Sequence, residues 1–146
     1  MNAEQIKALV IEATEEVFKK WNIDAIDKYY VADFVSHNPT RPEVFNLETY
    51  KKWVLMLKST GPQTVMILDD MIAEGNKVVT RWTATRTSEG VFFGVDITGK
   101  KVTWSGITIT RVADGKIAED WWSIDQLGFL QQLGIIPLLP GQAAKA

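Results

Sequence analysis

The chain has 146 residues, of which 46% are hydrophobic and 23% charged, and its formal net charge is −2. This length and apolar content predict one domain over residues 1–146 and exclude intrinsic disorder. The small net charge offers no basic field for nucleic acid, and no apolar run reaches the ~20 residues of a membrane helix. Cysteine is absent, which excludes disulfides and thiolate sites and favours a cytoplasmic protein.

The first sixty residues show the hydrophobic spacing of helices. Apolar residues recur at helical intervals over Gln5–Lys19, which predicts a first helix. A second, short helix is predicted over Ile23–Val31 and a third over Leu47–Lys58, where Asn46 can act as the cap. Two prolines within residues 36–42 predict a loop between the second and third helices.

After Pro62 the hydrophobic period changes from helical to two, which predicts strands. In chain order the predicted strands are Thr64–Glu74, Lys77–Thr87, Gly90–Asp96, Lys101–Val112 and Lys116–Ile124. The turn residues 113–115 join the last two strands as a hairpin. A short helix is predicted from Asp125 to Leu133, followed by a flexible tail over residues 137–146 that is rich in Pro, Gly and Ala.

This order of elements predicts an α+β domain in which the N-terminal helices pack on the concave face of a curved antiparallel sheet. Such a sheet leaves an apolar pocket at its open end, which is the default position of a ligand site. Along strand 116–124, alternation places Asp120 and Trp122 on one face and Glu119 and Trp121 on the other.

The second half of the chain also contains a recognisable succession of segments. In order they are residues 73–79, 81–85, Gly94, 98–100, 104–107, Arg111, 114–119 with Trp121 and Asp125, and 128–134. With the early segment 34–39, this succession resembles the SnoaL-like polyketide cyclase (ester cyclase) family over nearly the whole chain. No single segment is specific, but their order is.

The resemblance implies the cone-shaped fold of nuclear transport factor 2, a pocket without a cofactor, and dimers or tetramers built through the sheet. Relatives of the named cyclase close a polyketide ring by intramolecular aldol chemistry, using a pocket carboxylate and a nearby His. The expected function is proton transfer next to a carbonyl of an apolar or polycyclic small molecule. Because the fold also hosts binding modules, the alternative is a ligand-binding or assembly protein without turnover.

Three positions depart from the family pattern. The strand that usually reads Gly-Ile-His-Ile has Thr108 in place of the His, and Trp122 follows the strand Trp where a carboxylate is common. Arg86 stands where the family often has a His. These changes remove familiar acid–base groups and favour the binding alternative.

The candidate catalytic residues are Asp120, His37 and Asp70. The match to the family places the pocket on the Asp120 face, where neighbouring indoles would raise the pKa of this carboxyl. His37 is the only His and lies in the Pro-bounded loop, where it serves catalysis or bonds a turn carbonyl. Asp70 shares strand parity with Leu68 and Ile72, so it is expected to face inward as a base or as a buried, paired acid.

The candidate substrate-binding residues combine aromatic walls with a few polar groups, which suits a flat or polycyclic ligand. They are Trp82, Arg86, Trp104, Thr108, Trp122 and Asp125. Thr108 or a Trp indole N–H is the expected oxyanion donor. Asp125 has two interpretations, a pocket acid or the N-cap of the last helix.

The opposite strand face predicts self-association. It is expected to carry Val79, Ile107, Ile109, Ile117 and Trp121. Because three or four short helices cover only one face of the sheet, this apolar set predicts a two-fold sheet-to-sheet dimer.

Overall fold

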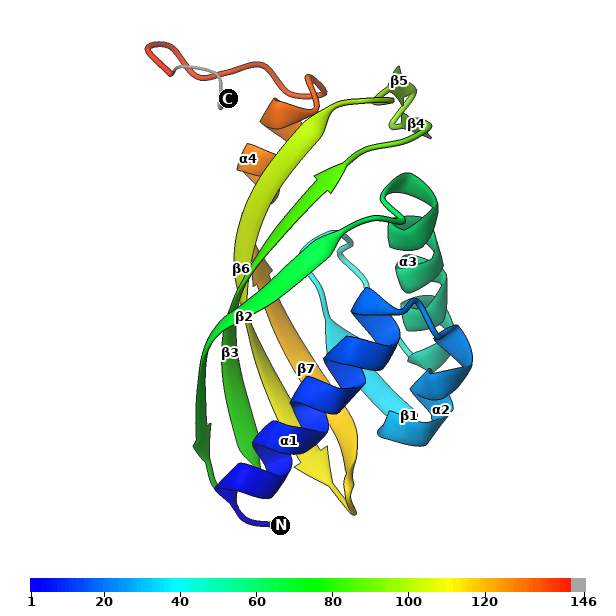
Figure 1. Ribbon diagram of the computed structural model, residues 1–146, viewed down its shortest axis with the longest axis vertical. Helices are drawn as coiled ribbons and strands as arrows, with labels where there is room; N and C mark the ends of the chain where they lie inside the picture. Colours follow the sequence, from blue (N-terminus) through cyan, green and yellow to red (C-terminus); the bar gives the residue numbers. More distant parts are fainter. Residues whose placement is uncertain (143–146) are drawn as a thin grey trace.

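A computed structural model describes residues 1–142, so residues 143–146 of the predicted tail lie outside the described part. A strongly curved sheet wraps around the helices α1 and α3, and α4 lies near one end of the sheet (Figure 1). The helices are α1 (Ala3–Thr14), α2 (Ile26–Tyr29), α3 (Leu47–Thr60) and α4 (Gln126–Gln132). The strands are β1 (Tyr30–His37), β2 (Val65–Glu74), β3 (Lys77–Thr87), β4 (Val91–Phe92), β5 (Val95–Asp96), β6 (Lys101–Ala113) and β7 (Lys116–Ile124).

The main sheet has five strands in the order β1-β7-β6-β3-β2, and β4 with β5 forms a separate hairpin. All neighbours are antiparallel except β1, which runs parallel to β7. The predicted α+β class is thus confirmed, with one parallel strand added. The predicted helix over Ile23–Val31 is wrong at its end, because the chain leaves α2 at Tyr30 to pair with β7.

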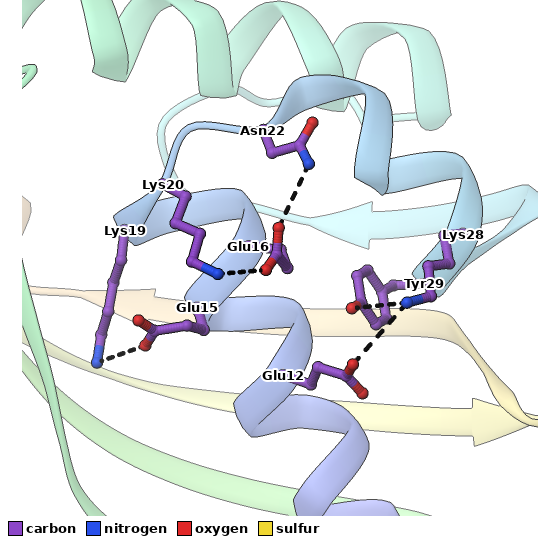
Figure 2. A network of polar contacts seen from close by, with 8 residues as sticks. All are labelled: Glu12, Glu15, Glu16, Lys19, Lys20, Asn22, Lys28 and Tyr29. Atoms are coloured by element: carbon purple, nitrogen blue, oxygen red, sulfur yellow. Dashed lines mark hydrogen bonds and ion pairs between the residues drawn. The ribbon is translucent and has the colours of Figure 1, made fainter.

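Helix α1 packs one face on the sheet and keeps its charges outside. Asn2 and Gln5 form a reciprocal capping box at its start, and Ile6, Val10 and Ala13 are buried. A π-helical turn (Glu15–Lys19) continues the helix. Figure 2 shows the polar contacts around this π-helical turn. On its exposed side, Lys20 Nζ lies 2.7 Å from Glu16 Oε1. Such surface pairs add little stability, so the buried face fixes the helix.

Helix α3 supplies the aromatic part of the core. Asn46 caps it by accepting a hydrogen bond from the Thr49 N–H at 2.9 Å, as predicted. Tyr50 is fully buried, and its ring lies 4.9 Å from Phe34 and 5.3 Å from Tyr30 between ring centres. These contacts join α3 to β1 and fix the helix across the concave side of the sheet.

Two irregularities reverse the predicted facing of individual residues. The β2–β3 register shifts between Leu68 and Asp70, so the Asp70 side chain is exposed and not inward-facing as predicted. The β6–β7 register shifts near Ala118, so Ile117 is buried in the core and does not belong to the outer apolar set. A β-bulge inserts one residue and turns the side chains beyond it to the other face.

Within residues 1–142, no helix is long and apolar enough to cross a membrane. No group of three or more His, Asp or Glu side chains in the same range has an arrangement that could hold a metal ion.

Candidate functional site

A large cavity of about 520 Å³ lies between the inner face of the sheet, α3 and α4. This is within the range of small-molecule sites. Four of the predicted binding residues line it: Trp82, Arg86, Trp104 and Trp122. Helix α3 adds Trp53, and α4 adds Phe129. The wall is therefore rich in aromatic side chains, as the sequence predicts.

A second, inner cavity of about 30 Å³ lies deeper along the sheet and has roughly the volume of one water molecule. Its lining includes the polar side chains of Thr14, Tyr30, Thr80, Thr108, Thr110 and Asp120. The side chains that line both cavities, and thus lie between them, are Phe18, Met66, Trp82 and Trp122. Predicted candidates therefore occupy two adjoining spaces and not a single one.

Asp120 is the most perturbed acid in the site. It is 2% exposed, and its Oδ1 accepts a hydrogen bond from Ser36 Oγ of β1. Burial raises the pKa of Asp120 to about 7, against the opposing effects of the Ser36 hydroxyl and the nearby Trp122 indole. Within residues 1–142 the indole Nε1 of Trp122 has no hydrogen-bond partner of good geometry, and its N–H dipole acts on Asp120 from nearby. Asp120 can hold or release a proton near neutral pH.

The Trp82 indole is fixed by a polar and a steric contact. Its Nε1 donates to Thr108 Oγ1 at 3.0 Å, which leaves the Thr108 hydroxyl hydrogen available to another acceptor. Opposite Trp82 in the β3–β6 pair stands Gly106. A Cβ at this position would lie 2.4 Å from the indole and 2.7 Å from the Ser123 carbonyl oxygen. Only glycine lets the Trp82 indole approach the backbone of β6 this closely.

We therefore expect Gly106→Ala to lower the free energy of unfolding by about 1–3 kcal/mol, because the added methyl overpacks the wall. Urea unfolding followed by tryptophan fluorescence measures this change. Ser105→Ala, an exposed neighbour on β6, is the control and should change stability by less than about 0.5 kcal/mol. Equal stability of Gly106→Ala and wild type would contradict the close approach.

Three predicted site residues lie away from both cavities. His37 stacks on Trp121 at 5.2 Å between ring centres, and its Nε2 lies 2.7 Å from Glu119 Oε2 on the outer face. The hydrogen bond from His37 lowers the pKa of Glu119. Asp125 caps α4 through a 3.0 Å hydrogen bond from the Gly128 N–H, which is the second of its two interpretations. Asp70 is exposed beyond the β2 bulge.

Sequence reasoning missed several residues of the site. Ser36, Tyr30 and Thr80 surround the Asp120 carboxyl or its cavity, and Trp53 and Phe129 extend the aromatic wall. A signal exists for β1: within Tyr30–His37 the side chains of Phe34 and Ser36 alternate onto one buried face. The predictions instead assigned its start to the helix ending at Val31 and its end to the Pro-bounded loop that begins at Ser36.

Comparison with known proteins agrees with this fold and cavity. The family model described as SnoaL-like polyketide cyclase matches residues 8–133. AclR, a candidate hydroxylase from Streptomyces galilaeus, is 27% identical with a TM-score of 0.85, over 96% of this chain and 87% of its own. A candidate polyketide cyclase from Acidithiobacillus ferrooxidans is 28% identical with a TM-score of 0.79, over 92% and 98% of the two chains. A search of curated proteins finds no match.

TsrD from Streptomyces laurentii, at 24% identity, shares the fold with a TM-score of 0.80 over 93% of this chain and 99% of its own. The family match spans most of the residues, and the sheet and helices follow the same arrangement. The chain belongs to the SnoaL-like polyketide cyclase family.

Proposed function

We propose that the protein is an enzyme that moves a proton next to a carbonyl of an apolar, cyclic small molecule, without a cofactor. The observation that carries this proposal is the buried Asp120 carboxyl, whose pKa near 7 suits a general base. It adjoins an aromatic cavity large enough for a polycyclic substrate.

The groups around Asp120 suggest how such a step would proceed. The carboxylate takes a proton from the carbon next to the carbonyl. Within residues 1–142 the buried Trp122 Nε1–H has no hydrogen-bond partner, and Thr108 Oγ1 accepts from Trp82, so the Trp122 N–H and the Thr108 hydroxyl can both donate to the developing enolate oxygen. The predicted second acid–base group, His37, lies on the outer face. Asp120 alone would therefore remove the proton and return it, as in an isomerisation or aldol closure.

The substrate must reach Asp120 past the side chains between the two cavities. Met66 is one of them, and its unbranched thioether has three rotatable bonds and adapts readily to a ligand. Movement of Met66 would join the inner cavity to the large one.

The experiment that tests this function needs no knowledge of the natural substrate. We expect the protein to catalyse exchange of the α-hydrogens of 1-tetralone with deuterium in D₂O, followed by NMR. Exchange should increase as pH rises through about 7, because the base is the ionised Asp120 carboxyl. The absence of protein-dependent exchange at saturating ketone would overturn the proposal.

One observation favours a second candidate, a ligand-binding module without turnover. The Phe18 and Trp82 rings are among the side chains that lie between Asp120 and the large cavity, where they shield the acid. Saturable quenching of tryptophan fluorescence by 1-tetralone without any exchange would identify this candidate. A cytoplasmic location and a cofactor-free site stay predictions under either function.

We also propose a homodimer formed through the outer face of the sheet. Ile67, Ile72 and Ile107 are 56%, 63% and 46% exposed on β2 and β6. Clusters of this kind mark contact surfaces. We expect a dimer by light scattering at micromolar concentration, and a monomer for Ile107→Glu. Val91→Glu, an exposed position on the separate β4–β5 hairpin, should stay dimeric. A wild-type monomer would contradict the proposal.

A further inference from the structure

Arg86 is the one charged side chain of the large cavity that is almost fully buried. It projects from β3, is 3% exposed, and lies 5.1 Å from the Phe129 ring centre and 5.6 Å from that of Trp104. Its Nη1 donates to Thr60 Oγ1 at 3.0 Å, while its Nε is buried without a hydrogen-bond partner in the described residues. Within residues 1–142 it forms no ion pair with an Asp or Glu, unlike the arginines at positions 41, 81 and 111.

The buried Arg86 guanidinium keeps its positive charge and has N–H groups that can still donate hydrogen bonds. Burial lowers the pKa of Arg86 to about 10, so the group is still positive at neutral pH. A buried cation without a counter-ion is unfavourable, because the lost hydration is not replaced. An anion in the cavity would supply both the counter-charge and acceptors for the free N–H groups.

The surrounding chain makes room for this arginine and holds it. A Cβ at Gly61 would lie 2.3 Å from Arg86 Cδ and 2.8 Å from Nη1, so the guanidinium occupies the space that a side chain there would fill. The Thr60 hydroxyl donates to the Met56 carbonyl at 2.9 Å, which turns its lone pairs toward Arg86. The end of α3 is thus shaped around the cation.

The other charges of the cavity have the same overall sign. Its remaining charged lining residues are Arg41, Glu43 and Lys52. Arg41 and Glu43 lie 3.7 Å apart and offset each other, which leaves Lys52 and Arg86. The cavity is therefore net positive within an aromatic wall.

We propose that the ligand of the large cavity is an aromatic or polycyclic carboxylic acid whose carboxylate binds Arg86. A planar carboxylate matches the guanidinium fork, and the Trp104 and Phe129 rings beside Arg86 offer apolar contact to the aromatic part of such an acid. On β3, Arg86 is four residues beyond Trp82, a distance of roughly 13 Å along an extended strand. The anchored acid would place its far end at Trp82 and the inner cavity. This inference rests on the proposed function only in taking the large cavity as the ligand site.

The test compares three probes of one shape: naphthalene-2-carboxylate, naphthalene-2-carboxamide and 2-naphthyl phosphate. Their affinities are measured by calorimetry at fixed pH and salt. We expect the carboxylate to bind at least about tenfold more tightly than the amide, as charge-assisted hydrogen bonds do. Equal affinities for acid and amide would overturn the proposal, and tighter binding of the phosphate would overturn the choice of carboxylate.

Variants assign the preference to Arg86. Arg86→Met should abolish the preference for the carboxylate over the amide. The affinity of this variant for the amide should stay within about threefold of wild type, and this result would show that the cavity is intact. Arg81→Met, the same change on the exposed side of β3, should retain the preference. Gly61→Ala keeps the charge but displaces the guanidinium, so the preference should fall. A preference that survives in Arg86→Met would contradict the assignment.

The outcomes separate this inference from the proposed reaction. Carboxylate selectivity without α-hydrogen exchange would support the anion site and reject the catalysis. Exchange that depends on Asp120 without carboxylate selectivity would reject the anion site and leave the catalysis.

Discussion

Asp120→Asn should slow the α-hydrogen exchange of 1-tetralone by a factor on the order of 10²–10⁴, the usual contribution of a positioned acid–base group. The amide has the size of the carboxyl and can still accept the hydrogen bond from Ser36, so the cavity wall keeps its shape. It cannot take a proton, so the step that forms the enolate loses its base. Rates with wild type and variant, measured by NMR at pH 8, give the ratio.

Asp70→Asn is the matched control. The sequence left both acids as candidate bases, whereas the structure places Asp70 on the exposed side of β2. Its variant should exchange at the wild-type rate. Full activity of Asp120→Asn would remove Asp120 from the mechanism.

The same substitution should change how stability depends on pH. The folded protein binds the Asp120 proton more tightly than the unfolded chain, because the pKa rises from 3.8 to about 7 on folding. Between these values the folded state carries more protons than the unfolded state, so wild-type stability falls as pH rises. The amide of the Asp120→Asn variant does not titrate. The variant should gain roughly 3 kcal/mol relative to wild type between pH 4.5 and pH 8.

Urea unfolding of both proteins at half-unit steps over this pH range measures the difference. Other titrating groups are common to the two proteins and largely cancel from it. The charge of Glu119 and that of His37 act on Asp120 in opposite directions and more weakly than burial. A difference that stays constant with pH would show that Asp120 is not perturbed by burial.

The regular strands of the sheet were predictable from local sequence. The predicted bounds Lys77–Thr87 and Lys116–Ile124 agree with β3 and β7. Alternation placed Asp120 and Trp122 on one face of β7, and the family resemblance assigned this face to the pocket; both residues do line a cavity. In these central strands successive side chains alternate between a buried and a more exposed face, so the period of two is clear.

Features that depend on distant partners were not predictable. Tyr30–His37 pairs with β7, and the short alternation at Phe34 and Ser36 can indicate a strand but not this distant partner. The bulge near Asp69 reverses Asp70, and the change of phase is hidden because β2 has apolar residues such as Ile67 and Ile72 on its exposed face as well. The sequence also could not show that Arg86 is buried without a counter-ion among residues 1–142. That property depends on which side chains pack around it in the folded chain.

The pairing of β1 with β7 also fixes when the site can form during synthesis. Ser36 and Asp120 are 84 positions apart in the chain, so closing this contact carries a large loop-closure entropy and is typical of slowly folding topologies. Until β7 has been made, β1 has no neighbour in the sheet, and the backbone groups that pair with β7 have no partner. A nascent chain that ends before residue 116 should therefore bind chaperones or aggregate. The acid–base site is completed only after β7 has been translated.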